Sequence, residues 1–324
     1  MSAADASSAP HRPLAILTGP TAVGKTEVAV DVALALGTEI ISADSMAVYR
    51  RMEAATAKPS AAQRARVPHH LIDVADPTEL FTVADYLRLA IPLIERLLGE
   101  GKTPLVVGGT RLYLVALTQP FDVAAPPQPA LRAAWSEVPS EALHARLQKV
   151  DPDTAARVHP HDRKRIVRAL EVFEATGVPL SVWQRQSQYQ PGRYAASTVV
   201  LIRDRAELYR RVDERVDAML AAGLVGEVRG FLAEGLGPDT PAMQGHGYKE
   251  IIRALLGEYS LAEGIRLLKR NTRRYVKYQL MWLHRWPGLH WVRADRPHAE
   301  GVAECVRIFQ TETAVEKPNA EGDV

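Results

Sequence analysis

A glycine-rich segment near the start of the chain holds the first residues whose types and spacing point to chemistry. It reads Gly19-Pro20-Thr21-Ala22-Val23-Gly24-Lys25-Thr26 and fits the phosphate-loop pattern G-x-x-x-x-G-K-[ST]. In such a loop the backbone N–H groups surround a phosphate, and the lysine adds a positive charge. The final hydroxyl is a ligand of Mg²⁺, which makes Thr26 the predicted metal ligand. The segment therefore predicts a di- or triphosphate site, but the motif does not identify the compound.

An acidic residue follows the next apolar stretch. Residues 39–42 are typical of a short strand, and Asp44 comes directly after them. In an open α/β sheet the functional groups lie at the carboxyl ends of the strands, so we expect Asp44 beside the phosphate loop. An aspartate in this position is also a common cap of a turn or helix. The residues alone leave both roles open.

The elements that must position these residues alternate along the chain. The pattern predicts strands at 14–17, 39–42, 71–74, 103–107, 198–202 and 289–292. Between and after them it predicts helices, among them 27–36, 83–98, 204–219, 248–256, 261–285 and 297–311. Alternation of this kind predicts a doubly wound parallel sheet of the P-loop NTPase-like α/β class, with a helical C-terminal region.

The strand at 103–107 lacks a feature that nucleotide hydrolysis needs. Such enzymes end a buried strand with an aspartate that organises Mg²⁺ and water. Here the strand ends in Gly108 and Gly109, and the expected strand-end acids are Asp44 and Asp73 alone. The sequence therefore argues against an ordinary ATPase.

A helical block interrupts the sheet pattern. Residues 119–197 hold a proline-rich loop and helices expected at 139–149, 153–158 and 162–176, with no strand. We therefore expect an inserted all-helical domain at 119–197 and a core built from 13–118 and 198–313. Residues 1–12 and 314–324 are expected to be disordered. Basic residues at 163–165 and 168 lie opposite an apolar stripe, and charge alone leaves open whether they bind nucleic acid or only face solvent.

The C-terminal helical segment is basic and aromatic. Between Arg266 and Arg293 there are eight Lys or Arg and no Asp or Glu, with Tyr275, Tyr278, Trp282 and Trp286 interleaved. Cations for phosphates and aromatic faces for unstacked bases suit RNA. The net charge of +2 requires any such surface to be local. The single cysteine suits a reducing cytosol, and no stretch reaches the ~20 apolar residues of a membrane span.

Eight segments, in order and over nearly the whole chain, resemble the bacterial tRNA dimethylallyltransferase family, also called tRNA isopentenyltransferases. They are GPTAVGKT (19–26), ISADSMAVYR (41–50), TAKPS (56–60), HHLID (69–73), VVGGTRLYL (106–114), HPHDRKRIVRALEVFEATG (159–177), QGHGYKE (244–250) and KRNTRRYVKYQLMWL (269–283). The chain departs from the family pattern at several positions, among them Ala47, His161, Tyr278 and Met281.

The resemblance implies transfer of a dimethylallyl group from dimethylallyl diphosphate to N6 of adenosine 37, next to the anticodon, in tRNAs that read codons starting with U. The products would be N6-dimethylallyladenosine and diphosphate. It further implies Mg²⁺ as cofactor, a cytoplasmic enzyme with no membrane association, and a monomer. The insertion and the C-terminal helices would hold the anticodon stem-loop.

The resemblance also implies roles for single residues. Asp44 would be the base, and Lys25, Thr26 and Arg215 would meet the charge of the leaving diphosphate, which the loop Gly19–Thr26 binds. The implied tRNA contacts are Asp44, Ser45, Met46, Ala47, Thr110, Arg132, Asp162, Arg163, Lys164, Arg165, Ile166, Gln244, Gly247, Tyr248, Arg274 and Lys277.

Three alternatives remain at this stage. A small-molecule or nucleotide kinase would use the loop, and hence the ATP-binding motif, for ATP. An isopentenyltransferase acting on free adenine nucleotide would not need the basic insertion. In an RNA-binding protein with a nucleotide switch, Asp44 would coordinate Mg²⁺ and would not act as a base.

Overall fold

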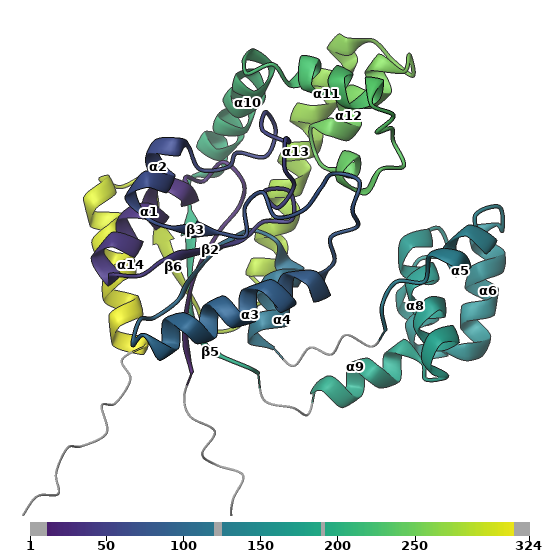
Figure 1. Ribbon diagram of the computed structural model, residues 1–324, viewed down its shortest axis with the longest axis horizontal. Helices are drawn as coiled ribbons and strands as arrows, with labels where there is room; N and C mark the ends of the chain where they lie inside the picture. Colours follow the sequence, from purple (N-terminus) through teal and green to yellow (C-terminus); the bar gives the residue numbers. More distant parts are fainter. Residues whose placement is uncertain (1–11, 120–124, 189–191, 314–324) are drawn as a thin grey trace, which may run out of the picture. The chain divides into compact units, whose positions relative to one another are not determined.

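The computed structural model describes residues 12–119, 125–188 and 192–313 (Figure 1). The expected disorder at 1–12 and 314–324 lies, except for Arg12, outside these residues. The chain divides into two compact units, one formed by residues up to 114 and from 194 onward, the other by Val115–Arg193. The second unit overlaps the helical insertion expected at 119–197.

The first unit is built on a six-stranded sheet in which every neighbouring pair of strands is parallel. The strands are β1 (Pro13–Thr18), β2 (Ile40–Ala43), β3 (His69–His70), β4 (Leu105–Gly108), β5 (Ala195–Ile202) and β6 (Leu289–Arg293), in the spatial order β3-β2-β4-β1-β5-β6. The central strand β1 lies between β4 and β5. The predicted doubly wound parallel sheet is therefore confirmed, with β6 at an edge as expected.

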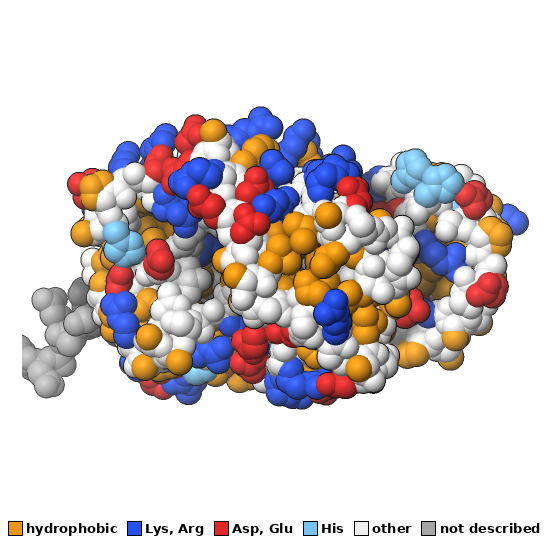
Figure 2. Space-filling view, turned by 90° about the horizontal axis from the view of Figure 1, so that it is seen from above, with side chains coloured by type: hydrophobic (Ala, Val, Ile, Leu, Met, Phe, Trp, Pro, Cys, Tyr) orange, Lys and Arg blue, Asp and Glu red, His pale blue; other side chains and the backbone are white. Residues whose placement is uncertain are grey.

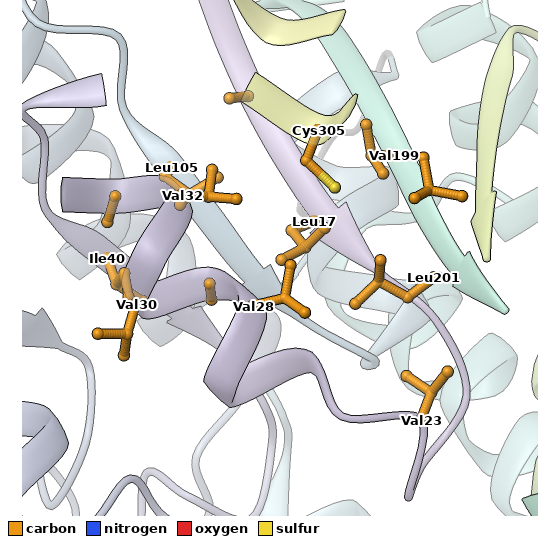
Figure 3. Close-up of a cluster of buried hydrophobic side chains, with 14 of the residues drawn as sticks. Leu17, Val23, Val28, Val30, Val32, Ile40, Leu105, Val199, Leu201 and Cys305 are labelled. Atoms are coloured by element: carbon orange, nitrogen blue, oxygen red, sulfur yellow. The ribbon is translucent and has the colours of Figure 1, made fainter. Parts of the chain in front are cut away.

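Helices cover the sheet on both faces because its central strands are apolar throughout. On one face α1 (Lys25–Leu36) and α14 (His298–Glu312) pack on Ala15 and Leu17, together with the buried Cys305 (Figure 3). Leu14 and Ile16 alternate with them, point to the opposite face and are also fully buried. Burial on both faces is what a parallel sheet requires, and it holds the strand ends in fixed register.

The remaining helices of the first unit lie against the sheet or around the carboxyl ends of its strands (Figure 1). They are α2 (Ala61–Arg66), α3 (Val83–Gly99), α4 (Arg111–Thr118), α10 (Arg205–Ala221), α11 (Leu224–Ala233), α12 (Tyr248–Leu255) and α13 (Leu261–Leu283), with a short 3-10 turn at Pro241–Gln244. Helices α4 and α11 were not predicted. Helix α4 extends from the first unit into the second.

The strand expected at 71–74 is wrong. The third strand is the two-residue β3, and Leu71 and Asp73 after it have positive φ angles of 61° and 58°. Asp73 consequently ends no strand, and its carboxylate pairs with Lys58 at 2.5 Å and with Arg64 at 3.1 Å. Asp44 is the acidic residue that follows a sheet strand beside the phosphate loop.

The second unit is helical, with α5 (Pro129–Ala134), α6 (Ser140–Val150), α7 (Pro152–Arg157), α8 (Arg163–Thr176) and α9 (Leu180–Gln188). Its core gathers Trp135, which directly follows α5, Leu147 of α6, and Ile166 and Leu170 of α8. Helices α5 and α9 were not predicted. The face visible in Figure 2 mixes basic and acidic side chains.

None of the helices in the described part of the chain combines the length and the apolar character needed to cross a bilayer.

Candidate active site at the strand ends

The phosphate loop connects β1 to α1 and depends on its glycines. Gly19 and Gly24 have φ angles of 143° and 103°, which side chains rarely permit. A Cβ on Gly19 would also lie 2.5 Å from the carbonyl oxygen of Leu201 on β5. The loop can therefore close over the end of the sheet only with glycine at this position.

Lys25 at the start of α1 is directed back over the loop. Its Nζ donates to the carbonyl oxygens of Gly19 and Pro20 at 2.9 and 3.0 Å. Burial, with a further contribution from the positive charge of Arg215, lowers the pKa of Lys25 to about 8, and the charge of Asp44 acts in the opposite direction. Burial likewise lowers the pKa of Arg215, and the negative charge of Asp44 partly opposes this shift. Lys25, Arg215 and Asp44 therefore form one electrostatic cluster.

Two arginines, Arg203 just after β5 and Arg211 on α10, donate hydrogen bonds to the backbone of the phosphate loop. Arg203 donates from Nε to the carbonyl oxygen of Val23, and Arg211 from Nε to that of Ala22, both at 2.8 Å. Arg215 lies one turn further along α10 and makes no hydrogen bond or salt bridge within the described residues. Its charge is therefore available to an anion above the loop.

Asp44 lies beside the phosphate loop and also caps a turn. Its Oδ1 accepts hydrogen bonds from the backbone N–H groups of Met46 and Ala47, at 2.8 and 3.3 Å, and so caps the turn after β2. Its Oδ2 accepts no hydrogen bond from the described residues. One oxygen fixes the carboxylate, and the other has no hydrogen-bond partner among the described residues.

The glycines that end β4 allow a close approach of neighbouring segments. A Cβ on Gly108 would lie 2.2 Å from the carbonyl oxygen of Ala43, and one on Gly109 would lie 2.7 Å from Nε2 of Gln279. Thr110 follows, and its Oγ1 accepts from the Ser45 N–H at 2.9 Å. A larger residue at the end of β4 would push apart the strands that carry Asp44 and the loop.

Gln279 of α13 is a site residue that the sequence analysis missed. Its side chain is almost fully buried, and its Oε1 accepts from the Thr21 N–H at 2.9 Å. Its Nε2 donates to the Gly109 carbonyl at 3.4 Å. The signal in the sequence that could have indicated this role was an amide side chain on the apolar side of a basic helix. Through it the phosphate loop, the β4 turn and α13 are held together.

Two cavities meet at this cluster. They share Thr21, Lys25, Asp44, Thr56 and Arg215. The cavity of about 390 Å³ adds the polar and charged groups of the loop side, including Gly24, Thr26 and Arg211 together with the acidic Glu27 and Glu214. The cavity of about 410 Å³ adds apolar and aromatic groups, namely Met46, Tyr49, Leu80, Phe81, Met219, Leu268 and Tyr275. An anion fits the first, and a flat or branched apolar group fits the second.

The implied RNA contacts of the first unit differ in their surroundings. Ser45, Met46, Thr110 and Gln244 line the larger cavity. Ala47, Gly247 and Tyr248 are buried, and the Tyr248 hydroxyl donates to Glu227 at 2.5 Å. Arg274 and Lys277 are exposed on α13 and make no hydrogen bond or salt bridge within the described residues.

Most of the implied contacts of the second unit have internal roles. Arg132 forms a bidentate pair with the fully buried Glu171 at 2.5 and 2.9 Å. Arg163 donates to three backbone carbonyls, those of Trp135, Ser136 and Val138. The Ile166 side chain is fully buried in the core of this unit, so it offers no surface to a ligand.

The start of α8 carries the remaining three. Asp162 caps the helix by accepting from the Arg165 N–H at 3.3 Å. The Arg165 side chain is 69% exposed and lies 3.2 Å from the Asp162 carboxylate. Lys164 also has an interaction partner. The two cavities described above are lined by residues of the first unit.

The fold and the paired cavities define a phosphate-loop protein with a second, partly apolar site at the strand ends. The sequence profile of the IPP transferase family matches residues 47–286, and that of isopentenyl transferases matches residues 13–70. The chain belongs to the IPP transferase family.

Individual relatives are similar over nearly their full length. The chain is 48% identical to the tRNA dimethylallyltransferase of Syntrophobacter fumaroxidans over 91% of its own length and 87% of the relative. It superposes on the tRNA isopentenylpyrophosphate transferase of Bacillus halodurans with a TM-score of 0.70 and 37% identity, covering 94% and 97% of the two chains. A eukaryotic dimethylallyltransferase acting on tRNA gives a TM-score of 0.80 and 25% identity, covering 94% and 81%.

Proposed function

We propose that the protein transfers a dimethylallyl group from dimethylallyl diphosphate to N6 of adenosine 37 in tRNAs that read codons starting with U. The observation that carries this proposal is the meeting of the cavity beside the phosphate loop and a partly apolar cavity at Lys25, Asp44 and Arg215. A diphosphate enters from one side and a nucleobase from the other. The membership in the IPP transferase family and the tRNA-modifying relatives support the same reaction.

The cavity beside the phosphate loop holds the leaving group. Loop N–H groups, Lys25 and Arg215 meet the negative charge that develops on the diphosphate as the carbon–oxygen bond breaks. Thr26 supplies a hydroxyl to the same cavity, and such hard oxygen donors, completed by diphosphate oxygens and water, suit Mg²⁺. The ion, when bound, would neutralise diphosphate charge. No group of three or more acidic, histidine or cysteine side chains in the described residues forms a separate metal site.

Asp44 acts on the acceptor. The exocyclic amine of adenine is a weak nucleophile because its lone pair is delocalised into the ring. Asp44 Oδ2 accepts a hydrogen bond from N6 and takes the proton as the bond from N6 to the allylic carbon forms. The carbon–oxygen bond breaks in the same event, so diphosphate leaves with the electron pair. Holding both substrates in adjoining cavities supplies a large share of the rate.

The acceptor base arrives as part of a tRNA anticodon stem-loop. A base in a folded stem-loop must turn out of its stack to reach a cavity at the strand ends. The exposed Arg274 and Lys277 on α13 are placed to contact RNA phosphates. We further propose that the enzyme acts in the cytoplasm, where unmodified tRNA is available, and that it is a monomer.

A kinase is the competing function for a phosphate loop. It would need a strand-end carboxylate beside β1 to organise ATP, and β4 ends in glycines. The deciding experiment incubates the protein with Mg²⁺, dimethylallyl diphosphate and unmodified tRNA, without ATP. Mass spectrometry of the digested tRNA should show N6-dimethylallyladenosine. No product in this reaction, together with phosphoryl transfer from ATP to a small acceptor, would overturn the proposal.

A further inference from the structure

A histidine outside the predicted set lines the cavity that takes the nucleobase. His246 lies between the 3-10 turn at Pro241–Gln244 and the start of α12, and it borders the 410 Å³ cavity together with Asp44. Its ring contacts that of Tyr275 on α13, with centroids 4.8 Å apart and planes at 44°. An imidazole and a phenol ring therefore adjoin each other at the wall of a site built for a purine.

The backbone on both sides holds this histidine in place. Gly247 has a φ of 99°, and a Cβ there would lie 2.8 Å from the Cβ of Ala55. The Gly247 N–H donates to the buried Glu250 at 3.0 Å, and Glu250 in turn accepts from Asn271 of α13 at 2.9 Å. The position of His246 is thus fixed by buried contacts on α12 and α13.

The two ring nitrogens of His246 have different surroundings. Nδ1 is sealed from solvent and has no hydrogen-bond partner among the described residues, whereas Nε2 is not sealed. A sealed N–H without an acceptor is rarer in proteins than a sealed lone pair, so the proton belongs on Nε2. Burial lowers the pKa of His246, in keeping with a neutral ring. The Nε2 edge, which is not sealed, therefore presents a single hydrogen-bond donor.

Adenine offers an acceptor on each side of the carbon that carries its amino group. N1 and N7 both accept hydrogen bonds, while guanine carries a proton on N1 and an acceptor oxygen in place of the amine. A carboxylate that accepts from the amine and an imidazole that donates to a ring nitrogen form a pair complementary to adenine. Guanine would meet Asp44 with an oxygen and, on its N1 side, His246 with a second donor.

We propose that His246 is a specificity-determining residue whose Nε2–H donates a hydrogen bond to a ring nitrogen of the target adenine beside the reacting amine. This inference rests on the proposed function, since it names how the same site recognises its acceptor base. It predicts that the contribution of His246 depends on one atom of the substrate.

The test compares three synthetic anticodon stem-loop RNAs with adenine, 1-deazaadenine or 7-deazaadenine at the target position. Each is assayed for kcat/KM of prenylation with the full-length protein and with His246→Phe, which keeps a ring against Tyr275. His246→Phe should lower kcat/KM on adenine by a factor of about two to ten, the range of one neutral hydrogen bond. On one of the two deaza bases the wild type should already have lost this factor, and His246→Phe should lose nothing more.

Two further variants keep the test falsifiable. His246→Gln retains a donor and should recover part of the rate on adenine, and it replaces His246→Phe if that variant does not fold. His284→Phe removes an exposed histidine of the α13 C-terminus and should leave all three rates unchanged. Equal losses on all three bases would assign His246 a structural role and overturn the inference. A wild-type protein that prenylates none of the RNAs would instead overturn the proposed function.

Discussion

Charged residues serve opposite purposes in the two units. In the second unit Arg132 and Arg168 converge on the fully buried Glu171, and Arg163 is occupied by three carbonyl groups. At the strand ends of the first unit, Arg215 and Oδ2 of Asp44 have no hydrogen-bond partner within the described residues. Both regions are rich in charge along the sequence, but Arg132 and Arg163 of the second unit have internal partners, whereas Arg215 of the first unit has none within the described residues.

The contrast shows what makes a charge available to a ligand. A guanidinium that already donates to buried acceptors would have to break those bonds to bind a phosphate, at a cost comparable to what it gains. An unpartnered cation in a cavity has no such cost. For these arginines of the two units, the hydrogen-bond partners of the residue indicate its availability to a ligand more directly than its place in a basic run does.

The largest expected effect comes from Asp44, the unpartnered acid of the first unit. Asp44→Asn keeps an oxygen that can cap the turn through Met46 and Ala47 but removes the base, so kcat should fall by about 10²–10⁴. Affinity for tRNA, measured by filter binding, should change little. A variant with near-normal kcat would show that the free carboxylate oxygen is not the base and would remove the contrast between the units.

An effect on stability is expected from Glu171, the partnered acid of the second unit. Glu171→Ala leaves Arg132 and Arg168 facing a buried site without their counter-charge. Loss of one partner of a buried pair costs ~3–5 kcal/mol, and the lower end applies because the two arginines are 42% and 33% exposed. Urea denaturation followed by circular dichroism measures the change.

Glu174 provides the matched control three residues along α8. Its partner Arg146 is 47% exposed, and pairs of this kind contribute ~0–1 kcal/mol. Glu174→Ala should therefore shift the urea midpoint only slightly. Equal destabilisation by the two variants would mean that the Glu171 network is no more than a surface ion pair.

The sequence predicted the sheet and the phosphate loop because both depend on local patterns. Apolar strands buried on two faces, and glycines at fixed spacing before a lysine, are visible without any tertiary information. The position of Asp44 beside the loop could be predicted because the residue directly follows a strand. The third strand was predicted at 71–74 because that run is apolar. It lies at His69–His70 instead, because Leu71 and Asp73 adopt positive φ angles that a strand does not allow.

The rest of the site depends on contacts between residues far apart in the chain. Gln279 lies 258 positions from Thr21, and no local pattern relates the two. His246 is recognisable only when its unpartnered nitrogen and its cavity are known. Charge alone left open whether the basic residues of α8 bind RNA or face solvent, because a helix face shows charge but not the carbonyls that Arg163 contacts.

The smallest expected effect separates two arginines that look alike in the sequence. Arg274 is exposed on α13 without a hydrogen-bond or salt-bridge partner in the described part of the chain, so its charge is available to an RNA phosphate. Arg274→Ala should weaken tRNA binding and reduce the slope of log K against log salt by about one. Lys277→Ala on the same exposed surface should act similarly.

Arg163→Ala provides the opposite expectation. Its guanidinium donates to the Val138 and Ser136 carbonyls at 2.6 and 2.9 Å, so its removal leaves acceptors of the second unit without a donor. The variant should lower the urea midpoint while the salt slope of tRNA binding stays at the wild-type value. Arg274→Ala should therefore change the salt slope but not the urea midpoint, and Arg163→Ala should change the urea midpoint but not the salt slope. A reduced salt slope for Arg163→Ala at unchanged stability would place a phosphate contact on α8, and would mean that an arginine can exchange backbone carbonyls for RNA.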